Sequence, residues 1–237
     1  MKTEASGFVG TVTNEAVPCG DCTVSLFGQT LALMPERAAW WRDTDTLLVA
    51  DLHFGKAAAF RAGGIPVPSG TTHDALGRLQ HLADRTRARR IVFLGDLLHA
   101  KAGRSNDVLD ALTDWRNANS DLELLLVRGN HDRHAGDPPG ELGIRCENAP
   151  FMIGPFAMSH HPAVHPDGYV IAGHVHPGIR LYGTGRERVR LPCFVFDESS
   201  AILPAFGDFT GLANIEPEPA RTIYAIAGEE VVRISNI

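Results

Sequence analysis

Short apolar runs alternate with longer amphipathic stretches through the middle of the chain. The runs at 47–50, 91–94 and 122–127 are dominated by Leu, Ile and Val, which is typical of strands buried on both faces. Between them, residues 71–89 and 106–117 place leucine and valine at helical spacing, and the first stretch ends in a group of arginines. The pattern predicts a parallel sheet with crossover helices.

The two ends of the chain differ from this middle. Residues 1–22 are small and polar and predict a loose extension, followed by a single domain over 23–237. Apolar positions alternate on both sides of Gly28, which predicts a hairpin over 24–32. The second half is poor in helical patterns, and we expect its strands to form a second sheet packed on the first. Those strands are expected at 156–158, 169–172, 188–191, 194–196, 222–226 and 231–234.

The composition is that of a globular protein. Hydrophobic residues make up 44% of the 237 positions and charged residues 21%, so the chain can bury a core without disulfides. No apolar run approaches the roughly 20 residues that cross a bilayer, and no signal-peptide pattern opens the chain. We therefore expect a cytoplasmic protein with no membrane partner. The net charge of −6 excludes a global positive field, although bound metal ions could make one site locally positive.

Cys19 and Cys22 form a lone C-x-x-C pair. A structural zinc site needs four ligands, and no second such pair is present in the sequence. A loop that carries two thiols is therefore the favoured interpretation, and a zinc site is the alternative.

Five short polar segments each follow a predicted strand. They are Asp51-Leu52-His53, Gly95-Asp96, Gly129-Asn130-His131-Asp132, His160-His161 and Gly173-His174-Val175-His176. Ligands of open α/β sheets bind beyond the carboxyl ends of the strands, so these segments are expected to meet in one crevice. The glycines among them suit tight turns. Taken singly, each segment is also explained as a turn or a surface pair, and the hypothesis of a common site depends on all five.

The donor atoms of these segments are carboxylate oxygens, imidazole nitrogens and one amide oxygen. Such a mixed set suits manganese, iron or zinc better than calcium. Seven candidate donors are too many for one catalytic ion with an open position. They fit two ions about 3.5–4 Å apart that share a carboxylate.

The five motifs in this order resemble the calcineurin-like metallophosphoesterase superfamily, over residues 47–176. A narrower resemblance, from about residue 24 to about residue 194, is to the ligase-associated DNA damage response endonucleases (PdeM-like), a bacterial branch. Its motifs are Asp51-Leu52-His53-Phe54-Gly55-Lys56, the loop 64–70, Gly95-Asp96-Leu97-Leu98-His99, His160-His161-Pro162 and Gly173-His174-Val175-His176-Pro177. The resemblance implies an α/β fold of two packed mixed β-sheets flanked by helices, a four-layer α/β/β/α sandwich.

The resemblance also implies roles for single residues. Asp51, His53, Asp96 and His176 would bind the first metal. Asp96, Asn130, His160 and His174 would bind the second, with Asp96 as the bridge. Manganese is the favoured ion, with iron or zinc as alternatives. A metal-bridging hydroxide would attack the phosphodiester in line, and His131 would stabilise the transition state or protonate the leaving oxygen.

Other polar residues near the motifs carry two interpretations each. Asp132 could orient His131 or a ligand, or could cap a helix. His161 could contact phosphate or support a ligand. Lys56, Lys101 and Arg104 could contact substrate phosphates or could be solvated surface charges.

Basic and aromatic residues outside the motifs offer candidate nucleic-acid contacts. Arg180, Arg186, Arg188 and Arg190 are opposed only by Glu187 and could follow a nucleic-acid backbone, but a hairpin with a solvated face is favoured. Trp40-Trp41 could stack on bases, but packing within a strand or core is favoured.

Three functions are compatible with these features. The first is a metal-dependent phosphodiesterase, a DNA endonuclease in repair; the resemblance supplies DNA as substrate and an association with a DNA ligase and a helicase. The second keeps the chemistry but acts on a nucleotide, cyclic nucleotide or lipid precursor, which the lack of a strongly basic composition favours. The third, a non-catalytic scaffold, is disfavoured because His131 and all seven candidate ligands are present.

Overall fold

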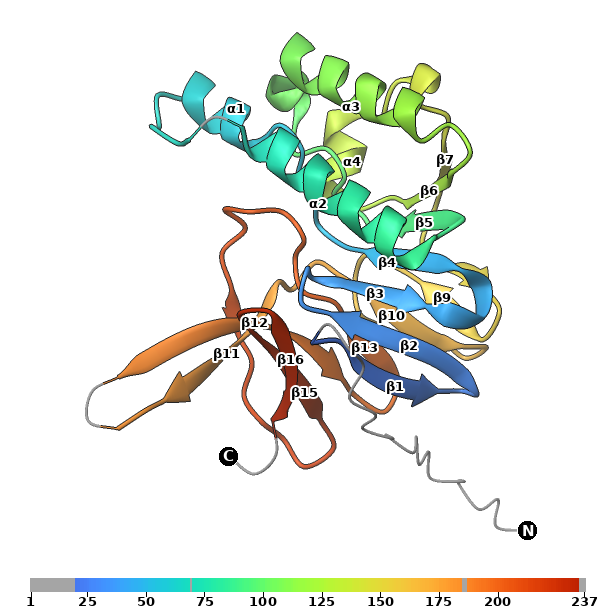
Figure 1. Ribbon diagram of the computed structural model, residues 1–237, viewed down its shortest axis with the longest axis vertical. Helices are drawn as coiled ribbons and strands as arrows, with labels where there is room; N and C mark the ends of the chain where they lie inside the picture. Colours follow the sequence, from blue (N-terminus) through green and yellow to red (C-terminus); the bar gives the residue numbers. More distant parts are fainter. Residues whose placement is uncertain (1–19, 69, 185–186, 235–237) are drawn as a thin grey trace.

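Two mixed β-sheets pack face to face in the computed structural model, which describes residues 20–68, 70–184 and 187–234 (Figure 1). The helices are α1 (Lys56–Ala62), α2 (Thr71–Thr86), α3 (Asn106–Ala118) and α4 (Asn130–Ala135). In spatial order the first sheet contains β1 (Cys22–Leu26), β2 (Gln29–Met34), β3 (Ala38–Trp41), β4 (Thr46–Val49), β5 (Arg90–Phe93), β6 (Glu123–Val127) and β7 (Ile144–Glu147). The predicted two-sheet α/β fold is confirmed.

The second sheet is built from the second half of the chain. In spatial order it contains β14 (Ala213–Asn214), β11 (Pro177–Tyr182), β12 (Arg188–Phe196), β13 (Ser200–Ile202), β10 (Tyr169–Ala172), β9 (Phe156–Met158) and β8 (Phe151–Ile153). Strand β15 (Thr222–Ala227) pairs with β12 and with β16 (Glu230–Ile234). Short 3-10 helices span Arg42–Thr44, Lys101–Gly103 and Gly140–Leu142.

Strand direction divides the first sheet into two parts. Strands β1 to β4 form an antiparallel meander, whereas β4, β5, β6 and β7 are parallel neighbours in sequence order. In the second sheet, β9 and β10 are also parallel neighbours. Each sheet therefore presents adjacent parallel strands whose carboxyl ends lie at one edge, where a ligand site is expected.

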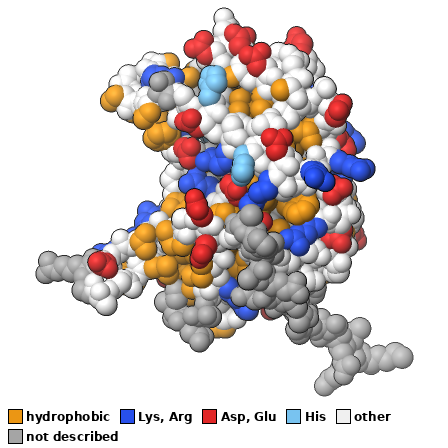
Figure 2. Space-filling view, viewed as in Figure 1, with side chains coloured by type: hydrophobic (Ala, Val, Ile, Leu, Met, Phe, Trp, Pro, Cys, Tyr) orange, Lys and Arg blue, Asp and Glu red, His pale blue; other side chains and the backbone are white. Residues whose placement is uncertain are grey.

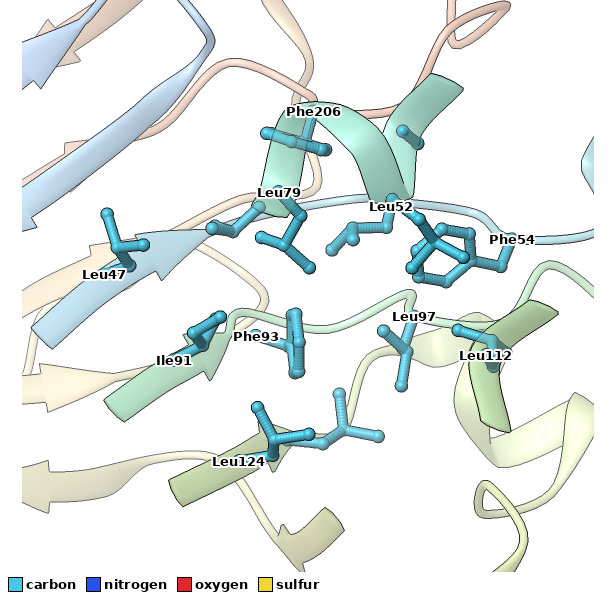
Figure 3. Close-up of a cluster of buried hydrophobic side chains, with 14 of the residues drawn as sticks. Leu47, Leu52, Phe54, Leu79, Ile91, Phe93, Leu97, Leu112, Leu124 and Phe206 are labelled. Atoms are coloured by element: carbon cyan, nitrogen blue, oxygen red, sulfur yellow. The ribbon is translucent and has the colours of Figure 1, made fainter. Parts of the chain in front are cut away.

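Alternation along the strands separates two cores. Leu47 and Val49 of β4 point toward the helices, while Leu48 between them points into the interface of the two sheets. Figure 3 shows the helix-side core, in which strand residues such as Phe93 meet Leu79 of α2 and Leu112 of α3. The α-helices of the described residues all lie between 56 and 135, and Figure 1 places them together at one end of the molecule. Among the described residues, the helical layer that the predicted four-layer sandwich would place outside the second sheet is therefore not present.

Most predicted elements are confirmed, and the differences have local causes. The helix predicted over 71–89 ends at Thr86 because Arg87 adopts a left-handed conformation, with φ 52°. The strands predicted at 188–191 and 194–196 are one strand, β12, which continues through Pro192. Trp41 is buried in β3 against Phe156, which confirms the packing interpretation for this tryptophan.

The predicted N-terminal extension is tested only at its end. Residues 1–19, including Cys19, lie outside the described residues. Cys22 begins β1 and is buried, so this cysteine lies in a strand and not in the predicted loop. In the part of the chain that the structure describes, none of the helices combines the length and apolar character needed to cross a bilayer.

Candidate metal centre

The five polar motifs lie together where the parallel strands of both sheets end. Asp51, Asp96 and Asn130 follow β4, β5 and β6, three adjacent strands of the first sheet. His160 and His174 each follow by two residues the ends of β9 and β10, which are neighbours in the second sheet. The predicted convergence of the motifs is therefore what the structure shows.

Short distances connect the carboxylates with the histidines. Asp51 Oδ1 lies 3.6 Å from His176 Nε2 and 3.7 Å from His160 Nδ1. Asp96 Oδ2 lies 3.7 Å from His53 Nε2, and Asp96 Oδ1 lies 3.4 Å from His160 Nε2. Asp96 therefore faces two groups of histidines, as a bridging carboxylate would.

The remaining two candidate ligands gather around His160. Its Nε2 lies 3.0 Å from Asn130 Oδ1 and 3.1 Å from His174 Nδ1. The backbone N–H of His174 donates to Asp51 Oδ2 at 2.8 Å, which connects the second sheet to the first. All seven predicted ligands thus belong to one connected cluster.

Backbone carbonyls fix the rings of two of these histidines. His160 Nδ1 lies 3.0 Å from the carbonyl oxygen of Leu94, and His176 Nδ1 lies 2.8 Å from that of Thr210. A carbonyl can only accept, so Nδ1 carries the proton in each ring and Nε2 presents a lone pair. This arrangement of an anchored ring with a free nitrogen is common among metal-binding histidines.

The donor set fits divalent metal ions. Asp51 Oδ1 and His53 Nε2 are buried without a hydrogen-bond partner among the described residues, which is costly for polar atoms. At His160 Nε2, the lone pairs of Asp96 Oδ1 and Asn130 Oδ1 converge with no hydrogen to separate them. A cation satisfies such converging lone pairs, and nitrogen with oxygen donors suits manganese, iron or zinc.

Five of the seven candidate ligands have left-handed backbone conformations. The φ angles are 55° at Asp51, 50° at His53, 53° at Asp96, 69° at His174 and 51° at His176. Such angles are uncommon outside glycine, although Asp, Asn and His tolerate them better than other residues. Each costs about 1–3 kcal/mol and persists only where the surroundings enforce it, which marks this cluster as a functional site.

Two glycines beside the ligands make room for them. A Cβ atom on Gly129 would clash with the Asp96 carboxylate, and one on Gly173 would clash with that of Asp51. Neither has a positive φ, so space for a carboxylate explains both, and the tight-turn explanation applies to Gly95, with φ 80°.

Burial controls the ionisation of the cluster. It lowers the pKa of His53 to about 2 and also lowers the pKa values of His160 and His174. Burial would lower the pKa of His176 as well, but the nearby Asp51 carboxylate raises the pKa above the ordinary value. Burial raises the pKa of Asp96. Histidines that stay neutral at pH 7 are ready to bind a metal.

Asp132 holds two of the ligand-bearing loops together. The side chain is 1% exposed; Oδ2 accepts the backbone N–H groups of Asp96 at 2.7 Å and Gly129 at 2.8 Å. Oδ1 accepts those of Leu97 at 3.0 Å and Leu98 at 3.3 Å. Both interpretations of this residue therefore apply in part, because the carboxylate caps α4 and also orients the Asp96 loop.

His131 is the candidate catalytic residue, and His99 is a neighbour that sequence reasoning left without a role. His131 Nδ1 lies 2.7 Å from the carbonyl oxygen of His99, which leaves Nε2 directed toward Asp96 Oδ2 at 3.9 Å. The two rings stack with centroids 4.8 Å apart. His99 Nδ1 also lies 3.4 Å from His53 Nδ1. The position of His99, three residues after Asp96, could have identified it from the sequence as part of the site. The carbonyl contacts of Leu94 and Thr210 could not be identified in this way, because they involve only the backbone.

The three remaining candidates, His161, Lys56 and Arg104, lie in different places relative to the cluster. His161 is exposed, and its ring centroid lies 4.1 Å from that of His174, at the rim of the cluster. Burial lowers the pKa of Lys56, and the charges of Asp96 and Asp51 oppose this, so the ammonium lies near the carboxylates. Arg104 instead donates to the carbonyl oxygens of Ala135 and Asp137, which ties it to the end of α4.

A comparison with solved structures shows what this chain is similar to. The crystal structure of Pseudomonas putida nuclease MPE is similar to this chain, with a TM-score of 0.81 and 40% sequence identity over 90% of this chain and 100% of that chain. Yfce, a phosphoesterase from E. coli, gives a TM-score of 0.36 at 14% identity over 80% of this chain and 97% of that chain, too low to support an argument. No family model and no curated protein matches the sequence.

Proposed function

Because the chain belongs to the metallophosphoesterase family that includes Pseudomonas putida nuclease MPE, we propose that it cleaves the phosphodiester bonds of DNA with two divalent metal ions. The enzyme class, a metal-dependent phosphoesterase, follows from the likeness to that nuclease. DNA as substrate, manganese as the ion and a role in repair are the parts that we propose. The observation that carries the proposal is the cluster of seven donors, in which Asp51 Oδ1 and His53 Nε2 are buried without a hydrogen-bond partner among the described residues and the oxygens of Asp96 and Asn130 face His160 Nε2.

We assign the donors to two ions. Asp51, His53 and His176 would hold one ion, because their ligand atoms lie within 4.8 Å of one another. Asn130, His160 and His174 would hold the other, and Asp96 would contact both. When bound, two such ions supply charge that holds phosphate oxygens and lowers the pKa of a coordinated water.

His131 would act on the leaving group. Its side chain is 36% exposed, so substrate can reach Nε2, while Nδ1 is engaged by the carbonyl of His99. A proton carried at Nε2 can pass to the departing alkoxide as the bond to phosphorus breaks. Stacking on His99 restricts the orientation of the His131 ring.

The test is manganese-dependent cleavage of a labelled single-stranded oligodeoxynucleotide, beside hydrolysis of bis(p-nitrophenyl) phosphate. The wild type should act on both, and only with metal. The Asp51→Asn variant loses a candidate metal ligand. Its activity should therefore fall by more than the roughly 10- to 100-fold that is typical when a residue that only contacts a metal ligand is replaced. Asp114→Asn, a change on the exposed face of α3, is the matched control and should keep full activity.

Other outcomes would contradict the proposal in distinguishable ways. Hydrolysis of nucleotides or phosphomonoesters without cleavage of DNA would favour the small-molecule phosphoesterase. Absence of any hydrolysis by folded protein that binds manganese would favour the non-catalytic scaffold.

A further inference from the structure

A two-stranded arm projects from the second sheet beside the metal centre. The β11–β12 arm comprises residues 177–182 of β11 and 188–192 of β12, which pair in antiparallel register (Figure 1). Only the first two residues of β11 pair with a further strand, β14. The outer part of the arm is therefore a two-stranded ribbon that extends into solvent.

The two faces of the arm differ in chemistry. Ile179, Leu181, Val189 and Leu191 share one face, and Ile179 is buried there in a small apolar cluster. The opposite face carries the pair Arg180 and Arg190 and, next to it, the pair Tyr182 and Arg188. The arm thus has one structural face and one face made of three arginines and a tyrosine.

The charges on this second face are not balanced by acids. Arg180 and Arg190 lie directly opposite each other, a like-charge arrangement that destabilises a sheet. Among the described residues, no carboxylate forms an ion pair with these arginines or with Arg188. A solvated face of a protein with net charge −6 would be expected to mix both signs. The uniform sign therefore indicates an anionic partner.

The aromatic member of this face is available for contact. Tyr182 is 67% exposed, and the Arg188 guanidinium lies 5.8 Å from the centroid of its ring. Exposed aromatic rings beside arginines are a common surface for single-stranded nucleic acid, because bases stack on the ring while phosphates meet the cations.

The arm is connected directly to the metal centre. Pro177, its first residue, follows the candidate ligand His176, and Arg190 donates to the carbonyl oxygen of Leu212. Leu212 belongs to the loop whose Thr210 carbonyl fixes the ring of His176. At about 3.3 Å per residue, the arm reaches about 20 Å from His176 to Tyr182. Figure 2 shows the outline of the molecule hollowed between the arm and the end that carries α1, a helix that begins three residues after His53.

We infer that the arginine–tyrosine face of the β11–β12 arm binds the backbone and bases of single-stranded DNA that leads to the metal centre. This inference rests on the proposed function, since it names the surface that would hold the substrate. Each arginine would neutralise one phosphate, and Tyr182 would stack on a base. The face would supply affinity for a polymer and none for a small diester.

The experiment compares two substrates in the complete enzyme with manganese. A labelled oligothymidylate, which does not pair with itself, reports on the arm, and bis(p-nitrophenyl) phosphate reports on the metal centre alone. The test variant replaces Arg180 and Arg188 with alanine and keeps Arg190, because Arg190 contacts the loop that holds the ring of His176. The control variant replaces the exposed Arg87 and Arg89 with alanine, which removes the same charge elsewhere.

Counterion release sets the expected effect. Each phosphate contact to single-stranded nucleic acid contributes about 0.7 to the slope of log affinity against log salt concentration. Loss of two contacts should lower the salt dependence of kcat/KM for the oligothymidylate by about 1.4, and should lower kcat/KM about 25-fold at about 0.1 M salt. Tyr182→Ala should lower kcat/KM for the oligothymidylate roughly tenfold. The salt dependence of kcat/KM should stay unchanged, because stacking releases no counterions.

The outcomes are separable. Normal hydrolysis of bis(p-nitrophenyl) phosphate by the test variant, with loss of oligothymidylate cleavage that the control variant does not show, supports the inference. Equal kcat/KM and equal salt slope in the wild type and the test variant overturn it while leaving the DNA nuclease intact. Failure of the wild type to cleave oligothymidylate overturns the proposed function as well.

Discussion

Replacing Asp132 with asparagine should destabilise the protein and weaken metal binding although Asp132 is not a candidate ligand. The carboxylate is 1% exposed and accepts four backbone N–H groups, two on each oxygen. Asparagine keeps the shape but replaces one oxygen with an amide that cannot accept. Two buried N–H groups, expected to be those of Leu97 and Leu98 because their hydrogen bonds are longer, would then lack a partner.

The size of the effect follows from these contacts. An unsatisfied buried donor costs about 1–3 kcal/mol, so two cost about 2–6 kcal/mol. Burial raises the pKa of Asp132, which means that the charge itself is disfavoured, and removing it offsets part of this cost. We expect a net loss of about 3 kcal/mol. Because the same hydrogen bonds position the Asp96 loop, manganese affinity should fall about 10- to 100-fold.

Urea unfolding of the chelated protein, followed by circular dichroism, measures the first effect, and calorimetric titration with manganese measures the second. Asp114→Asn makes the same chemical change at an exposed position of α3 and should alter neither quantity. An Asp132→Asn variant with wild-type stability and wild-type manganese affinity would refute the positioning role.

Three further predictions concern the centre itself. His131→Gln should lower DNA cleavage about 10²- to 10⁴-fold and largely spare bis(p-nitrophenyl) phosphate, whose nitrophenolate departs without a proton; equal losses in initial rate on both substrates would contradict the leaving-group role. Gly129→Ala should weaken manganese binding in calorimetric titration because its Cβ would clash with the Asp96 carboxylate, whereas Gly140→Ala, whose Cβ meets nothing within 4 Å, should not. In chelated protein, His53 stays neutral when folded, with its pKa lowered to about 2, but binds a proton near pH 6.5 when unfolded, so stability is lost as pH falls below that value. Between about pH 7.5 and about pH 4.5, urea unfolding should show the wild type losing roughly 2.5 kcal/mol more than His53→Gln, and parallel profiles would contradict this account.

The elements that sequence reasoning identified are those with a strong local pattern. Strands β4, β5 and β6 are short aliphatic runs, and α2 and α3 repeat leucine or valine at helical spacing, so each was located to within a few residues. Helix α1 escaped prediction because its sequence, KAAAFRA, has no apolar stripe and is only seven residues long. Strand β7 has a mixed pattern, since Ile144 and Cys146 alternate with charged residues over only four positions.

Some features of the candidate site could be predicted from the sequence, and others could not. The convergence of Asp51, Asp96 and Asn130 follows from strand-end geometry, because parallel neighbours end at one edge. That His160, His174 and His176 meet them depends on how two sheets pack, which no local pattern encodes. The anchors on Leu94, His99 and Thr210 are backbone carbonyls, which every residue has, so their positions emerge only from the folded chain.

The division of the donors between the two sheets has a consequence for biosynthesis. Asp51, His53, Asp96 and Asn130 come from the first sheet, but their histidine partners come from the second. Strand β10, which precedes His174, pairs with β13 at Ser200–Ile202, and the carbonyl that fixes His176 belongs to Thr210. A ribosome-bound chain therefore cannot complete the donor set until residue 210 has emerged, and metal binding becomes a late step that coincides with the closing of the fold. A chain released before that point would have no phosphoesterase chemistry.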